Sequence, residues 1–301
     1  MKPDAKIGKR KKLTSVLGLT LDGSRLEGVV LKRTNGSLQQ LQRFSAQLTL
    51  DPLTAAPELV GREIRNQLDA AGIREKYCVV GIPLRWVLTA QTELPALPPD
   101  DAASLLQLEA EKSFHTDITG LQLGQSASVL AGGKQWVLLA GVPHTQAGAL
   151  EQVLAAAKLK PVSFTLGLTA LGATKPAAGR ISLVVGESMV GLQIQTGDGL
   201  TALRALEGTV ETVGGRPVIQ AATVAREIRI TLGQLPAELR ATVKEIVLLG
   251  PPESVRSLAD ELELKFEAAG LAIVIQENYP PNTFGVTLPA GASLSAAFSL
   301  A

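Results

Sequence analysis

The sequence is poor in cysteine, histidine and aromatic residues. It holds one cysteine, Cys78, and two histidines, and aromatic residues make up only 3% of the chain. A lone cysteine cannot form a disulfide within the chain, and the apolar surroundings of Cys78 predict a buried thiol in a protein of a reducing compartment. His115 and His144 have no cysteine or histidine partner at the spacing of a zinc site. With few aromatic residues, the core must be built from Leu, Val, Ile and Ala.

The chain also lacks an excess of charge of one sign and a long apolar run. Its net charge is +1, and its basic residues are not interleaved with aromatic ones, so neither feature supports nucleic-acid binding. No apolar run approaches the roughly 20 residues that a membrane-crossing helix needs. Residues 1–12 are the local exception, with six basic residues and one acid, Asp4. We expect a solvated, disordered tail there, with contact to phosphates or an anionic bilayer as the alternative.

What is present is a recurring order of predicted elements. Three strands are expected at 15–21, 26–32 and 38–48, separated by the turn signals Asp22-Gly23 and Asn35-Gly36. A helix follows, because apolar residues recur at helical spacing between 60 and 71. The apolar run 77–82 then predicts a strand that is buried on both faces.

The same order returns in the second half of the chain. Strands are expected at 181–185, 190–196 and 200–205, followed by a helix with Val224 and Ile228 on one face and a buried strand at 244–249. Two copies of the order β-β-β-α-β predict two similar lobes that face each other across a cleft.

The stretch between these copies predicts a smaller α+β unit. It combines a strand near 86–93, a proline-rich connector, a helix after Asp100, a hairpin around Gly132-Gly133 and a helix that begins near Thr145. We therefore expect a first lobe at 13–83 and 161–178, an inserted subdomain at 84–160, and a second lobe at 179–301.

Several segments resemble one known family. Residues 17–24, with the strand that follows, resemble the opening of the type IV pilus assembly protein PilM. Residues 79–83, Thr92-Glu93-Leu94-Pro95 and the helix carrying Glu109-Ala110-Glu111 also match in order and spacing. The resemblance extends from about residue 13 to 301, and the cytoplasmic part of the secretion protein GspL is a close relative. It implies an α/β, actin-like (ribonuclease H-like) fold of two lobes.

The sequence departs from this family where nucleotide phosphates and Mg²⁺ would bind. Thr20 stands where the family has an aspartate, Asp22 where it has a glycine, and Val184 where the second lobe has another aspartate. Mg²⁺ bound with a nucleotide is held by one or two carboxylates and the phosphates. We therefore expect no functional ATP or Mg²⁺ binding and no ATPase activity. The degenerate loops comprise Thr20, Asp22, Gly23, Ser24, Gly186, Glu187 and Gly250.

The resemblance implies an assembly scaffold at the cytoplasmic face of a bacterial inner membrane. PilM-like proteins bind the cytoplasmic N-terminal peptide of a PilN-like membrane protein, in a groove that involves the first lobe and the inserted subdomain. A GspL- or GspM-like protein and a motor ATPase are further possible partners. For the groove we expect the region of Tyr77, Val79, Trp86, Leu106 and Phe114, although for most of these residues core packing is the better explanation.

Two other functions stay open at this point. An ATP-binding switch whose lobes close on nucleotide requires that the altered loops be tolerated. A sugar- or acetate-kinase-like enzyme is less favoured, because it needs intact phosphate loops and a catalytic carboxylate that the sequence does not offer. The sequence does not choose between a pilus and a secretion system.

Overall fold

The computed structural model describes residues 14–34, 37–52, 54–166, 178–186, 188–197, 199–214, 216–276 and 286–287. The basic segment 1–12 and Glu187 lie outside the described residues. In the described part, no helix is both long and apolar enough to span a bilayer.

The first lobe is built on a six-stranded sheet with the order β16-β3-β2-β1-β4-β8. The strands β1, β2 and β3 form an antiparallel meander, and β4 and β8 continue the sheet in parallel with β1. These elements are β1 (Ser15–Asp22), β2 (Arg25–Thr34), β3 (Ser37–Gln47), α1 (Pro57–Ala70), β4 (Tyr77–Ile82), α3 (His144–Ala156), β8 (Lys160–Leu166) and β16 (Val286–Thr287).

The second lobe repeats this topology. Its sheet has the order β11-β10-β9-β14-β15, again an antiparallel meander followed by two parallel strands. Helices α4 and α6 contribute buried residues to its core. The elements are β9 (Gly179–Val185), β10 (Val190–Thr196), β11 (Gly199–Leu206), the hairpin β12 (Val210–Val213) and β13 (Arg216–Ile219), α4 (Ala221–Gln234), α5 (Ala237–Thr242), β14 (Val243–Leu249), α6 (Pro252–Phe266) and β15 (Ala272–Ile275).

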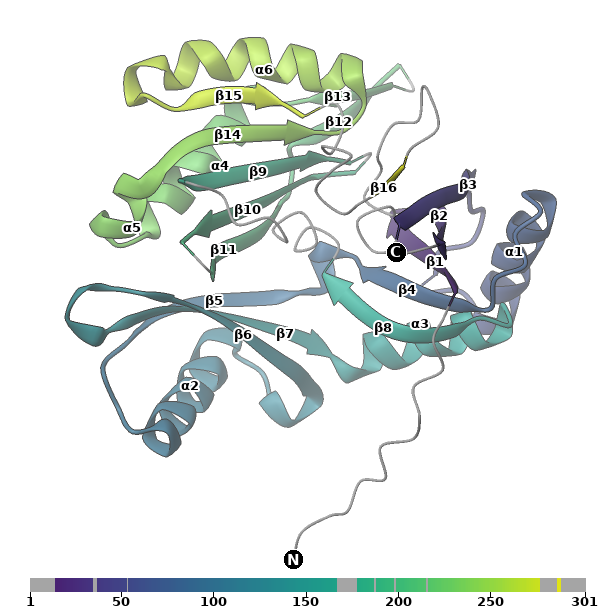
Figure 1. Ribbon diagram of the computed structural model, residues 1–301, viewed down its shortest axis with the longest axis horizontal. Helices are drawn as coiled ribbons and strands as arrows, with labels where there is room; N and C mark the ends of the chain where they lie inside the picture. Colours follow the sequence, from purple (N-terminus) through teal and green to yellow (C-terminus); the bar gives the residue numbers. More distant parts are fainter. Residues whose placement is uncertain are drawn as a thin grey trace, which may run out of the picture.

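The inserted subdomain is a three-stranded antiparallel sheet, β5-β7-β6, with α2 packed on one face (Figure 1). Its bounds are β5 (Leu88–Leu94), α2 (Pro99–Phe114), β6 (Leu121–Val129) and β7 (Gln135–Pro143). Two lobes with duplicated β-β-β-α-β units and an inserted α+β subdomain are the actin-like architecture that the resemblance implies, so the expected fold class is confirmed.

Helix α3 is placed differently from the sequence-based boundary, which assigned residues 84–160 to the subdomain. Its residues Leu150, Val153 and Leu154 are buried in the core of the first lobe. A Cβ atom on Gly61 of α1 would meet Ala156 and lie 2.6 Å from the carbonyl oxygen of Val153. The two helices therefore pack backbone to backbone, and residues 144–160 belong with the first lobe.

The other end of the chain also returns to the first lobe. Strand β16 pairs in parallel with β3, Val286 opposite Leu38. Residues 286–287, which the sequence assigned to the second lobe, thus extend the first sheet.

The inserted subdomain bridges the two lobes, because β6 and β7 lie against β11 (Figure 1). The backbone N–H of Leu200 donates to Ser126 Oγ at 2.8 Å. A register shift between β10 and β11 leaves Thr201 outside the regular ladder, and its carbonyl accepts from the indole N–H of Trp136 at 3.1 Å. A Cβ on Gly199 would lie 2.5 Å from the carbonyl oxygen of Ala127, so only glycine permits this approach.

Candidate functional site

The first hairpin of the expected nucleotide site is a tightly bonded turn. Thr20, near the end of β1, is half-buried and lies opposite Gly81 of β4. Gly23 forms the turn with φ of +60°, a conformation that favours glycine. The carbonyl of Ser24 accepts the N–H of Leu48 at 2.7 Å, and its hydroxyl accepts from the side-chain amide of Gln47. Ser24 is thus engaged in fastening the hairpin to the end of β3.

Asp22 is the last residue of β1 and pairs with Arg25, and its side chain lies outside what the structure describes. Arg25 forms an ion pair with Glu27 at 2.8 Å and donates from Nε to Ser45 Oγ at 3.1 Å. The carboxylate of Glu27 partly neutralises the guanidinium of Arg25, so the hairpin attracts a phosphate group less strongly.

The second hairpin and the loop after β14 are packed against each other. The N–H of Gly186 donates to the carbonyl of Met189 at 3.0 Å, which closes the turn between β9 and β10. Gly250 has φ of +148°, and a Cβ there would lie 2.8 Å from the side chain of Val185. The glycine is therefore required by the close approach of the loop to β9. Pro252 begins α6, so the first turn of that helix lacks one backbone donor for an anion.

These loops offer little chemistry for a metal or a phosphate. Val184 lies between Gly191 and Leu249 in the sheet and has no side-chain oxygen, and Thr20 offers a neutral hydroxyl. Among the described residues, no group of three or more His, Cys, Asp or Glu side chains is arranged to hold a metal ion. The expected loss of nucleotide binding stays a prediction.

The lone thiol is buried in the first lobe, as its apolar surroundings predict. Cys78 on β4 has no exposed surface, and burial raises the pKa of its thiol to about 12. Since the thiolate is the reactive form, this residue is inert at neutral pH.

The residues expected at the partner groove divide into two groups. Trp86 is 6% exposed in the core of the first lobe, and Leu106 and Phe114 are each 8% exposed in the core of the subdomain. They pack the interior of the units beside the expected groove. Tyr77 and Val79 of β4 are half-buried. Partner binding in this region stays a prediction.

The open strand edge in this region is β8, and β4 lies between β1 and β8 in the sheet. Sequence reasoning placed the exposed edge around 77–86 and so missed β8. Along β8, Val162 is 47% exposed, and Ser163 lies opposite Val79. In the part of the chain that the structure describes, no strand pairs with the outer edge of β8. The alternating residues 162–166 were the only signal in the sequence for this strand.

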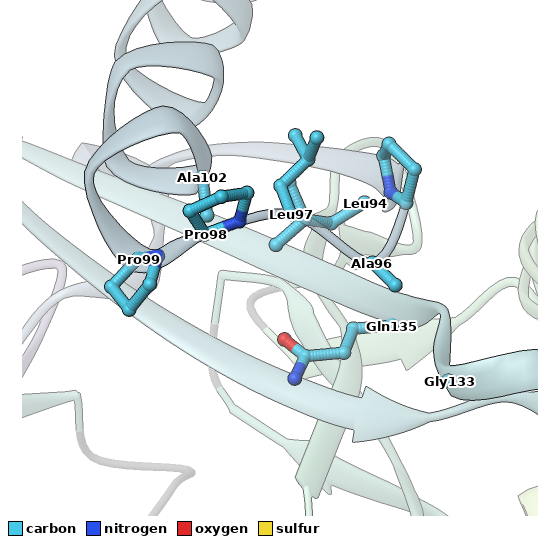
Figure 2. Close-up of a pocket in the computed structure, with 9 residues that line it drawn as sticks. Leu94, Ala96, Leu97, Pro98, Pro99, Ala102, Gly133 and Gln135 are labelled. Carbon is cyan, nitrogen blue, oxygen red and sulfur yellow. The ribbon is translucent and has the colours of Figure 1, made fainter.

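A shallow pocket of about 550 Å³ lies on the subdomain, where the proline connector turns into α2. Figure 2 shows Leu97, Pro98 and Ala102 on one side and the amide of Gln135 on the other. Such a lining suits an aliphatic or proline side chain of a peptide, with one amide to hydrogen-bond its backbone.

The solved structures that resemble this arrangement include the following two. One is a chain of the PilM–PilN type IV pilus biogenesis complex, with a TM-score of 0.64, 21% sequence identity, and coverage of 93% of this chain and 91% of that chain. The chain has the fold of a pilus-assembly protein. The second is the cytoplasmic domain of EpsL, an inner-membrane component of the type II secretion system of Vibrio cholerae, with a TM-score of 0.51, 11% identity, and coverage of 79% and 82%.

The likeness to the PilM–PilN structure spans both lobes and the subdomain, which confirms the resemblance found in the sequence at the level of fold. No protein-family model matches the chain, and no curated protein matches it in sequence.

Proposed function

We propose that this protein is a cytoplasmic scaffold of an inner-membrane assembly platform, in a type IV pilus or a type II-like secretion system. It binds the cytoplasmic N-terminal peptide of a PilN-like membrane protein and has no enzymatic activity. The observation that carries the proposal is the fold shared over 93% of the chain with a member of the PilM–PilN complex. The EpsL domain supports the same location, because it too is part of an inner-membrane machine.

The outer edge of β8 is the proposed site for the peptide. An extended peptide adds to an open edge through backbone hydrogen bonds, and pockets for alternate side chains provide specificity. Val162 supplies exposed apolar surface on this strand, and Tyr77 and Val79 lie on the neighbouring strand β4. The pocket beside Pro98 is a second apolar contact for a longer peptide.

The bridge between the subdomain and β11 also favours a scaffold over a switch. A nucleotide switch works by closure of its lobes, whereas here the hydrogen bonds of Ser126 and Trp136 hold β11 to the subdomain, beside the first lobe. GspM-like proteins and a motor ATPase are further candidate partners on the same platform.

Calorimetry with a synthetic PilN-type N-terminal peptide tests the proposal. We expect binding to the wild-type protein and at least a tenfold loss with Val162→Asp, because a charge at the edge opposes strand addition. Val213→Asp is the matched control, since Val213 is 59% exposed on the distant hairpin β12. Absence of peptide binding, or equal losses in both variants, contradicts the proposed site.

Calorimetry with Mg-ATP tests the alternative, an ATP-binding switch. We expect no heat of binding up to millimolar nucleotide, because the loops lack the carboxylates that hold Mg²⁺. A micromolar Kd would show that the loops do bind nucleotide and would favour the switch.

A further inference from the structure

Basic side chains gather at one end of the first-lobe sheet. Strands β1 and β4 run in parallel with Leu17 opposite Cys78, so the start of β1 lies level with Lys76. The carbonyl of Lys76 accepts the N–H of Lys160 at 2.6 Å, and Lys32 lies opposite Ser15 at the start of β1. Strands β2, β4 and β8 thus each bring a lysine to the same end of the sheet, with β1 between β2 and β4.

Residues beside these strand ends add further charge. Arg74 precedes β4, Lys158 follows the end of α3, and the N–H of Arg33 donates to the carbonyl of Thr14 at 2.9 Å. We name the set the basic end; it comprises Lys32, Arg33, Arg74, Lys76, Lys158 and Lys160.

All six side chains of the basic end are exposed. Within the described part of the chain, none of the six takes part in an ion pair. Glu75 is the one acidic residue within two positions of any of the six in the sequence, and it is half-buried. The whole chain has a net charge of only +1, so acidic residues elsewhere offset the positive charge of the basic end. The charge is therefore unevenly distributed over the protein.

The basic N-terminal segment joins the molecule at this same place. Thr14, the first residue of the described structure, is bonded to Arg33. The sequence before it contains six more basic residues: Lys2, Lys6, Lys9, Arg10, Lys11 and Lys12. The chain therefore attaches this basic segment to the end of the lobe that carries the basic end.

We propose that the basic end binds the anionic phospholipid surface of a membrane. Four of its six residues are lysines, which act as hydrated point charges, whereas bidentate recognition of a phosphate group uses the planar fork of arginine. Clusters of basic residues are attracted to anionic headgroups without a shaped pocket. The described basic end has no exposed aromatic side chain on which nucleic-acid bases could stack, which argues against a single-stranded nucleic acid.

Binding through the basic end would orient the first lobe on the membrane in a way that suits the proposed peptide partner. The basic end lies at the start of β1, opposite the hairpin with Thr20 and Gly23, so that hairpin faces away from the bilayer. Strand β8 begins at Lys160 in the basic end and runs away from it. A peptide that emerges from the membrane therefore meets the open edge of β8 directly. Lipid binding itself does not depend on the proposed function, although the choice of the inner membrane does.

Sedimentation of the full chain with phospholipid vesicles tests the proposal, with no partner protein present. We expect binding to vesicles of phosphatidylcholine mixed with phosphatidylglycerol, weaker binding as salt rises, and no binding to pure phosphatidylcholine. The variant Lys76→Gln, Lys158→Gln, Lys160→Gln should lower the partition coefficient roughly a hundredfold, at about fivefold for each lost charge.

The matched control removes three exposed lysines elsewhere: Lys112→Gln, Lys244→Gln and Lys265→Gln. It should bind as the wild type does, although its net charge changes equally. The proposal is overturned if both variants lose vesicle binding equally or if the first variant binds as the wild type does. It is also overturned if the protein binds duplex DNA in place of vesicles. Peptide binding is measured on the same proteins, so a wild type that binds the peptide but not the anionic vesicles counts against this inference alone.

Discussion

The two lobes have the same strand order but bury their middle strands differently. Every residue of β10 in the second lobe is buried, including Gln193 at 1% exposed and Gln195 at 7%. The equivalent strand β2 in the first lobe ends in three exposed residues, Lys32 to Thr34. The inserted subdomain packs on β11, next to β10, and no described element covers the end of β2 in the same way. The inserted subdomain thus covers part of the second-lobe meander, and the described first-lobe meander has no such cover at the end of β2.

The helices are also held by different chemistry. In the first lobe, α1 and α3 meet through Gly61, and Glu63 accepts hydrogen bonds from the N–H of Thr49 at 2.6 Å and of Leu50 at 3.2 Å. In the second lobe, α4 is fixed to β11 by the ion pair of Glu227 with Arg204 at 2.9 Å. Equal topology therefore does not imply equal sources of stability.

The largest effects are expected from Leu19→Ala and Leu183→Ala, at equivalent places on β1 and β9. Each leucine is at most 1% exposed, so each truncation should lower the free energy of unfolding by about 2–5 kcal/mol. Urea titration followed by tryptophan fluorescence compares the lobes, because Trp86 lies in the first-lobe core and Trp136 contacts β11. Single-tryptophan versions should show one shared transition. Two separate transitions would mean that the bridge does not couple the lobes.

Gly61→Ala tests the helix contact that is particular to the first lobe. The added methyl group would press on the backbone of α3, and we expect a loss of about 1–3 kcal/mol in the free energy of unfolding, measured by chemical denaturation. Gly148→Ala is the control, because a Cβ there meets nothing within 4 Å and should stabilise α3 by about 0.5–1 kcal/mol. If both substitutions stabilise the protein, the helices do not pack as closely as described.

Trp136→Phe tests the bridge to the second lobe. It leaves the carbonyl of Thr201 without its indole donor, which should cost about 1–3 kcal/mol and increase proteolysis of β11. Trp86→Phe is a useful comparison, because its buried indole N–H has no hydrogen-bond partner in the described structure. A smaller loss at Trp136 than at Trp86 would indicate that this hydrogen bond does not hold the bridge.

Glu63→Gln gives the smallest expected effect and a pH dependence. Burial raises the pKa of the Glu63 carboxyl, but hydrogen bonds from the N–H and hydroxyl of Thr49 and from the N–H of Leu50 outweigh it, so the pKa lies below its ordinary value. A lowered pKa stabilises the fold above the unfolded-state pKa, and this contribution is lost as pH falls through the folded-state pKa.

The loss from Glu63→Gln should thus be about 1 kcal/mol at neutral pH and should shrink below about pH 4. Denaturation of the wild type and the variant across this range measures it. A difference that grows on acidification would contradict the direction of the pKa shift.

The order of elements was readable from the sequence because each signal is local. Apolar alternation marked the meander strands, and turn pairs such as Asp22-Gly23 marked their hairpins. The buried position of Cys78 followed from its apolar neighbours in the same way. For most of the residues expected at the groove the sequence favoured core packing, and the structure buries Trp86, Leu106 and Phe114.

The sequence by itself determined the meander strands of both lobes, the helix and buried strand that follow each meander, and their duplicated order, since each depends on nearby residues alone. The missing carboxylates of the loops followed from the resemblance to a family. Only the tertiary structure decided that α3 packs on α1, that β8 forms the open edge, that the subdomain docks on β11, and that distant lysines share one end of a sheet. These features arise from contacts between residues far apart in the chain, where glycines and a shifted strand register set the approach, and no local pattern encodes such partners.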